Sequence, residues 1–433
     1  MNRPELKRTL GLFALVAYGV GDTLGAGIYA LVGKIAGLVG PACWLSFLTA
    51  ITAAGFTALS YAELGARYPY ASGEAHYTYE ACRFRLFSHA VGFLVFMSGI
   101  TSMCAVAHAF AGYLAPIFPG LPLPVIAIPF FTVIGAITLS GVENSSRTNM
   151  ICTLIEVSGL LIVIAAGFAY WGKSDVNYFA FLPELTTPGA RIQAVLSGTV
   201  FAFYAFIGFE DMVKASEEVK DPQKNLPKAI LLILLITGIL YLLVALSAVT
   251  VLSPAALKAS SAPLMDVVKT GAPAVPLWVF TAIALFAVAN TALVNFMMAS
   301  RILYGMSHDK LVPAVFGRVN RKFQTPHIAT AFVFGIVIVL TLTGNIMRLA
   351  QSTAVLLLCA FFAVNLSLLV LKFRKVPAPP KVFKAPLWAP ALGIFCCAGL
   401  LFYASLSAIF TALVLLGISF LLFFLTRLNI QRK

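Results

Sequence analysis

Glycines that interrupt otherwise apolar runs are the residues best placed to bind a small polar molecule. Residues 19–27 hold four glycines among nine positions, and each costs a helix about 1 kcal/mol relative to alanine. A later apolar run carries Gly208 near its middle, with the acids Glu210 and Asp211 directly after it. Both runs are therefore predicted to unwind locally. The backbone groups freed by unwinding must avoid lipid, and they can line a cavity instead.

The chemistry of such a turn follows from its free backbone groups. N–H groups at the start of a half-helix favour a carboxylate, and freed carbonyls suit an ammonium. The small glycine residues allow a ligand to approach the backbone closely. A zwitterionic amino acid or an organic cation would match this site without any charged side chain.

Carboxyl groups at membrane depth form the second set of candidates. A charged side chain there costs about 2.5–3.5 kcal/mol or more, so it needs a partner or a function. For Glu156, about seven residues into its apolar segment, we hypothesise a proton-carrying role. The alternatives are a protonated glutamate bonded to the unwound turn, and a sodium ligand.

Two further acids flank the predicted breaks. Glu210 is expected either to have a functional role at the break or to pair with a basic residue. Asp22 is expected to lie near Glu156 or to bind a substrate cation. Asp211 would face about 100° away from Glu210 on a helix, and we expect it to be structural.

The composition points to a bilayer as the surrounding solvent. The chain has 433 residues, of which 60% are hydrophobic and 11% charged, and its mean hydropathy is +0.95. Soluble chains have about 25% charged residues, so soluble enzymes, nucleic-acid-binding modules and disordered proteins are disfavoured. The expected class is an all-α integral membrane protein with twelve transmembrane helices. Segments long enough to cross the hydrocarbon lie at about 9–33, 41–65, 87–115, 124–142, 149–171, 192–213, 227–252, 275–304, 327–345, 349–372, 386–404 and 406–426.

The net charge of +14 has a topological explanation. All but six of the 30 basic residues fall in one alternating set of loops, which predicts that these loops and both termini are cytoplasmic. No nucleic-acid partner is therefore expected. The seven cysteines have no metal-ligand spacing, no catalytic motif of a hydrolase is present, and we expect neither enzyme activity nor a cofactor or metal. The six basic residues outside the predicted cytoplasmic loops are Lys34, Lys173, Arg191, Lys258, Lys269 and Arg348.

The two interrupted segments are the first and the sixth. They occupy corresponding positions if the chain consists of two five-helix repeats followed by two further helices. Interruptions at matched positions of two halves mark the substrate site of a transporter. The expected parts are residues 1–172, residues 173–375 and residues 376–433.

An ordered set of short motifs resembles a known family. The motifs lie at residues 25–29, 40–41, 60–69, 209–210, 217–227, 301–304 and 309–326. Together they resemble the amino acid–polyamine–organocation permeases over about 370 residues, and residues 204–211 look most like its cationic amino acid transporters. The resemblance implies a five-plus-five inverted repeat of the leucine-transporter type, alternating access and amino acid transport in the plasma membrane.

The resemblance also implies a substrate site. The amides of Gly25, Ala26 and Gly27 would receive the substrate carboxylate, and Ile28 follows them. The α-ammonium would meet backbone carbonyls of both breaks, with Phe206 beside them and the Tyr204 ring as a gate. Those carbonyls belong to Thr23, Tyr204, Ala205 and Ile207. The pocket walls are expected from spans three, eight and ten, near Met103, Asn290 and Ser352.

The sequence departs from the family in two acids. Many members carry a lysine where this chain has Glu156, so the lysine-based coupling scheme does not carry over. Most have a small residue in place of Asp22. Transport is expected to be proton-coupled or an exchange, with sodium as the alternative ion. A polyamine or another organic amine is the alternative substrate; it would leave the amides of residues 25–27 unused and give Asp22 and Glu210 more weight.

Overall fold

A computed structural model describes residues 8–114, 118, 120–260, 262–320, 323–343, 346–380 and 382–431. Within these ranges the chain is almost entirely helical, and the one β-bridge joins Leu10 to Val219. A helix satisfies its own backbone hydrogen bonds, which is what a chain of this hydropathy requires inside lipid.

The described residues of the first half of the chain form six α-helices. In chain order they are α1 (Leu12–Val39), α2 (Trp44–Arg67), α3 (Gly73–Cys82), α4 (Arg85–Leu114), α5 (Leu123–Leu139) and α6 (Val142–Tyr170). Two 3-10 turns accompany them, η1 (Pro41–Cys43) and η2 (Trp171–Lys173).

The second half begins with an interrupted segment. It consists of α7 (Pro188–Ala205), η3 (Phe209–Val213) and η4 (Ser216–Glu218). The chain continues as α8 (Pro222–Val251), α9 (Pro254–Ala259), α10 (Pro263–Gly271), α11 (Leu277–His308), η5 (Ala314–Gly317), α12 (His327–Thr343) and α13 (Ile346–Phe373), and the last helices are α14 (Trp388–Phe402) and α15 (Leu406–Gln431).

Local sequence signals explain where several of these helices start. Proline lies in the first turn of α7, α8, α9 and α10, where its missing N–H leaves no helix bond unmade. The side chain of Thr187 caps α7 by accepting from the Ala190 amide, and Ser253 caps α9 through the Ala256 amide.

Each of the twelve predicted segments overlaps a helix, but not every helix is long enough to be counted as a span. Among the described residues, eight helices are long and apolar enough to cross a membrane, or nine if α14 and α15 form one span bent by 114°. The helices α5 and α12 have 17 residues each, short of the roughly 20 that a bilayer needs. A multi-pass membrane protein is confirmed, whereas the count of twelve stays a prediction.

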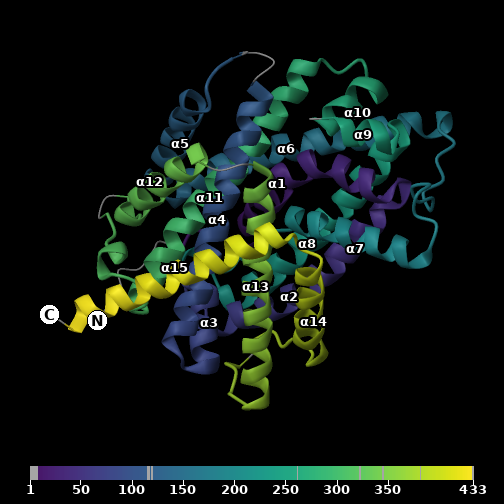
Figure 1. Ribbon diagram of the computed structural model, residues 1–433. Helices are drawn as coiled ribbons and strands as arrows, with labels where there is room; N and C mark the ends of the chain where they lie inside the picture. The colour runs from purple at the N-terminus through teal and green to yellow at the C-terminus, as the bar shows by residue number, and fades with distance from the viewer. Residues whose placement is uncertain are drawn as a thin grey trace.

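Helices at matching positions of the two halves pack against each other. Contacts join α1 to α7, α2 to α8, α4 to α11 and α5 to α12. Figure 1 shows α4 and α11 next to each other near the middle of the molecule, with α5 and α12 together at one side. An inverted repeat would produce this pairing, although the repeat and its boundaries stay predictions.

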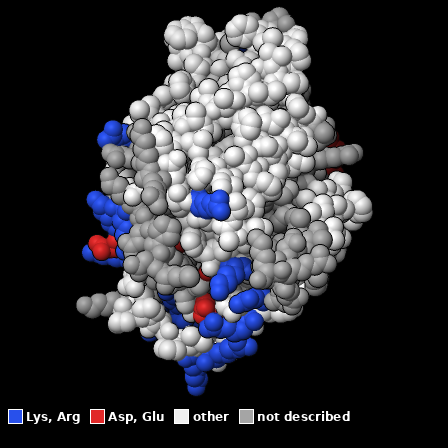
Figure 2. Space-filling view, turned by 90° about the vertical axis from the view of Figure 1, so that its left-hand side faces the viewer, with Lys and Arg blue, Asp and Glu red and all other residues white. Residues whose placement is uncertain are grey.

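Basic side chains gather toward one end of the molecule. Figure 2 shows most Lys and Arg of that face on its lower part, below a broad area without charges. The lower end in Figure 1 holds α3 and the end of α13. This separation matches the loop assignment made from the sequence.

Candidate functional site

The break in the first span lies at Gly25. Its backbone angles, φ −15° and ψ −159°, are not helical, and they divide α1 into an N-terminal half before Gly25 and a C-terminal half after it. Just before the break, the Thr23 hydroxyl donates to the Gly19 carbonyl at 2.8 Å. The interruption predicted within residues 19–27 is therefore present.

The sixth span breaks where predicted as well. Helix α7 ends at Ala205, and the chain turns at Gly208, whose φ of +131° suits glycine, before η3 begins. The Glu210 carboxylate accepts from the Gly208 amide at 2.8 Å and so caps the turn. Glu210 thus has a backbone partner that the sequence did not reveal.

The two breaks touch each other. A methyl group on Gly208 would lie 2.9 Å from the Thr23 nitrogen, and one on Gly27 would lie 2.7 Å from the Ala205 Cα. No side chain fits in these gaps, so the backbones of α1 and the sixth span meet directly. The structure thereby brings the residues predicted around both breaks into one region.

Tyr241 of α8 joins the two breaks, and sequence reasoning missed it. Its buried hydroxyl lies within hydrogen-bonding reach of the carbonyl oxygens of Thr23 and of Ala205, the latter at 2.9 Å. These are two of the four carbonyls expected to receive the substrate ammonium. A hydroxyl-bearing aromatic inside the apolar α8 segment was the available signal.

A cavity of about 10 Å³, with room for roughly one water molecule, adjoins the second break. Its walls include Ile207 and residues of α4, α11 and α13. These helices correspond to spans three, eight and ten, from which the pocket walls were expected. Thr353 of the wall adjoins Ser352 in sequence, and Gly99 lies one helical turn from Met103. Ser98, Gly99, Asn295, Met298, Thr353 and Leu357 line the cavity, and Met103, Asn290 and Ser352 do not.

Asn290 instead binds the N-terminal half of α1. Its amide nitrogen donates to the Gly21 carbonyl at 3.2 Å, and its oxygen accepts from Asn149 at 2.9 Å. Glu156, fully buried on α6, lies beside the Asn290 side chain, yet neither of its carboxylate oxygens has a hydrogen bond of good geometry to the described residues. Glu156 and Asp22 therefore lie among different partners, since Asp22 faces Gly208 of the sixth span.

Buried ionic contacts close the site on the side where the residues before α1 lie. We call this side the N-terminal side. Arg301 of α11 binds the Glu218 carboxylate through two nitrogens, at 3.1 and 2.8 Å, and both side chains are buried. The Glu218 carbonyl in turn accepts from the amides of Thr9 and Leu10 at 2.9 and 3.0 Å. The segment before α1 is thus tied to the loop after the sixth span.

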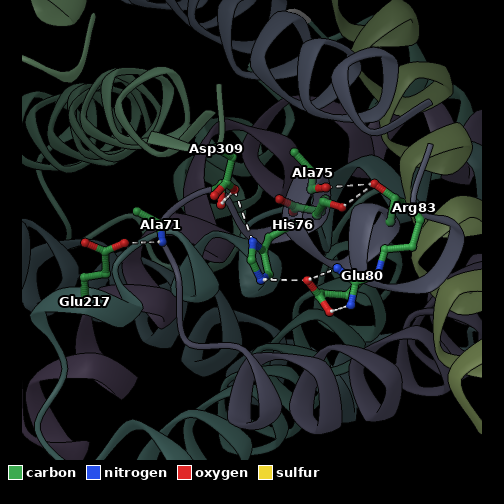
Figure 3. A network of polar contacts seen from close by, with 10 residues as sticks. Ala71, Ala75, His76, Glu80, Arg83, Glu217 and Asp309 are labelled. Atoms are coloured by element: carbon green, nitrogen blue, oxygen red, sulfur yellow. Dashed lines mark hydrogen bonds and ion pairs between the residues drawn. The ribbon is translucent and has the colours of Figure 1, made fainter. Parts of the chain in front are cut away.

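A second network spans α3, the loop before it and the end of α11. In Figure 3, His76 lies between Asp309 and Glu80, with its Nδ1 3.2 Å from the Asp309 carboxylate. Glu80 also binds Arg83 at 2.7 Å, and nearby the Ala71 amide donates to Glu217 at 3.0 Å. The contacts of Asp309 and Glu217 tie α3 and the loop before it to the end of α11 and to η4.

Known proteins that resemble this chain in sequence are permeases and transporters, which agrees with a site built from two broken spans. The profile of the family described as amino acid permease matches residues 10–431. The branched-chain amino acid permease BcaP of Bacillus subtilis is 30% identical, covering 97% of this chain and 93% of that protein. The vacuolar cationic amino acid transporter 2 of Arabidopsis thaliana is 32% identical over 85% of this chain, which spans 60% of that longer protein.

A relative with a different cargo also matches. The methylthioribose transporter of Bacillus subtilis is 28% identical, over 88% of this chain and 85% of its own length. All three relatives are named as permeases or transporters rather than enzymes. The resemblance found in the motifs is confirmed, and the chain belongs to the amino acid permease family.

Proposed function

We propose that this protein is a secondary transporter that carries amino acids across the plasma membrane by alternating access, coupled to protons or by exchange. The observation that carries the proposal is the direct contact between two broken spans, at Gly27 against Ala205 and Gly208 against Thr23. Backbone groups freed inside a membrane protein are tolerated where they line a cavity, and broken spans at matched positions mark transporter sites.

In this proposal the substrate lies at the two breaks. The amides of Gly25, Ala26 and Gly27 bind its carboxylate, with Ile28 next to them. The carbonyls of Tyr204 and Ile207 bind the α-ammonium, beside Phe206. The carbonyls of Thr23 and Ala205 bind it too once the Tyr241 hydroxyl gives way, so Tyr241 holds the site together before substrate enters.

The proposed membrane arrangement keeps twelve spans. Residues 1–172 and 173–375 form the two repeats, and residues 376–433 add two helices. The basic end of the molecule and both termini face the cytoplasm. The contacts between matched helices of the two halves support this arrangement.

The coupling group is a buried carboxyl. Glu156, Glu210 and Asp22 are all buried at or beside the moving breaks, and a proton is favoured over sodium as the coupling ion. For Glu156, uptake should rise from pH 8 to pH 6 in the wild type and lose that rise in Glu156→Gln. Unchanged pH dependence in the variant would remove Glu156 from this role.

Thermal stabilisation of the purified protein by ligands tests the substrate class. A ligand that binds only the folded state raises stability by RT ln(1 + [L]/Kd), so weak binders are detected at millimolar concentration. We expect a group of similar amino acids to raise the melting temperature. Stabilisation by polyamines alone, or by amino acid methyl esters as well as free acids, would contradict recognition of the carboxylate by residues 25–27.

A further inference from the structure

Five ionisable side chains form a buried cluster below the two breaks. They are Asp22 of α1, Glu74 of α3, Glu210 and Asp211 of η3, and Lys214, and none is more than 7% exposed. Four carboxyl groups thus share one ammonium group inside the protein. Buried carboxylates without counter-charges repel one another strongly, so a cluster of this composition requires bound protons.

Three of the four carboxyl groups have hydrogen-bond donors. The Lys214 ammonium binds Asp211 and lies 3.4 Å from Glu74, which also accepts from the Tyr61 hydroxyl at 3.0 Å. Glu210 accepts from the Gly208 amide.

Asp22 is the exception. Its Oδ2 accepts no hydrogen bond from the described residues. This oxygen lies close to Gly208, since a methyl group added to Gly208 would be only 3.0 Å from it. The side chain of Asp22 is within hydrogen-bonding reach of Asp211. Two carboxylates can form that bond only if one of them carries a proton, and close carboxyl pairs commonly share one.

We propose that Asp22 and Asp211 form a carboxyl pair that binds one proton whenever the N-terminal side of the transporter is closed, and loses it when that side opens. The pair bridges the two moving elements, since Asp22 belongs to the N-terminal half of α1 and Asp211 follows the break of the sixth span. The inference rests on the proposed function in taking these two elements as the parts that separate.

The fate of each group on opening follows from the contacts. When the N-terminal half of α1 swings about Gly25, Asp22 leaves Asp211 and meets water, and the shared proton passes to that water. Asp211 remains paired with Lys214, so its ionised form stays balanced. Closing again requires one proton from solution, which makes closure favoured at low pH.

Other titratable groups surround the pair. The Lys214 ammonium favours an ionised pair, whereas the other acids favour the shared proton. From each packed element these groups are Tyr18 on α1, Tyr61 on α2, Glu74 and Tyr77 on α3, Glu156 on α6, Glu210 and Lys214 around η3, Tyr241 on α8, and the Arg301–Glu218 pair joining α11 to η4.

Amide hydrogen exchange of the purified full-length protein measures the closed state directly. The Thr9 and Leu10 amides are bonded only while the segment before α1 stays against Glu218. After correction for intrinsic exchange, the wild-type protection of residues 9–10 should fall by about tenfold per pH unit over the pH range in which the closed pair still holds its proton and the opened carboxyls do not, because the closed state there binds one more proton than the open state. Asp22→Asn should abolish this fall, since the N–H of an asparagine amide can donate to Asp211 without first taking up a proton from solution.

The variants separate the possible outcomes. Asp211→Asn provides the second test if Asp22→Asn does not fold, with the same loss of pH dependence expected. Persistence of the fall in both variants, or its loss in Glu156→Gln instead, would overturn the pair. This assay needs no transported substrate, so a protein that shows the fall but transports nothing refutes the proposed function and leaves the carboxyl pair standing.

Discussion

At the scale of single residues, Tyr241 and Lys214 carry much of what the sequence did not show. Each is a polar group inside or beside an apolar segment, and its importance depends on which face of its helix or turn meets the site. Tyr241 reaches both breaks, and Lys214 supplies the one ammonium of the buried cluster. Neither position follows from spacing alone, because the rotation of a helix within a bundle is set by its neighbours.

Tyr241→Phe should loosen both breaks. The change removes the one hydroxyl hydrogen that is within reach of the buried carbonyls of Thr23 and Ala205, at a cost of about 1–3 kcal/mol. We expect a lower melting temperature of the substrate-free protein. The matched control is Tyr18→Phe, because among the described residues the Tyr18 hydroxyl donates only to the Met297 sulfur, at 3.6 Å. Equal effects of the two changes would show that the bridging carbonyls are not what Tyr241 stabilises.

At the scale of elements, the breaks require two backbones to meet without side chains between them. Gly27→Ala places a methyl group 2.7 Å from the Ala205 Cα, which cannot move away as a flexible side chain would. Overpacking of this kind costs about 1–3 kcal/mol, so we expect uptake to fall by about tenfold or more. In Gly55→Ala, the new methyl group would lie 3.8 Å from the nearest side-chain atom, and uptake should be kept. Normal uptake by Gly27→Ala would argue against close contact of the breaks.

The Arg301–Glu218 pair should hold the N-terminal side closed. Glu218→Gln leaves a buried guanidinium without its counter-charge, and breaking a buried pair costs about 3–5 kcal/mol. Amides of residues 9–10 should then lose protection from hydrogen exchange at every pH. The exposed pair between Arg83 and Glu80 is the control, since Arg83→Gln removes an interaction worth about 0–1 kcal/mol. Unaltered protection in Glu218→Gln would mean that other contacts keep this side shut.

At the scale of the whole molecule, composition predicted the all-helical, multi-pass class, and glycine placement predicted the two breaks. The breaks at Gly25 and Gly208 were predictable because glycine acts locally, through its own backbone freedom. The partners of Asn290 and Asp211 were not, because they depend on contacts between segments distant in sequence. Asp211, expected to be structural, binds the Lys214 ammonium, and the proposed proton-sharing pair would give it a second role.

Counterflow in sealed proteoliposomes tests the central claim most directly. Vesicles loaded with an unlabelled amino acid that stabilises the protein should take up the same labelled amino acid without any ion gradient, and Gly27→Ala vesicles should not. Saturable uptake that depends on the internal amino acid is the predicted result. Ligand binding with no counterflow across the whole stabilising set would contradict a transporter that works through the two broken spans.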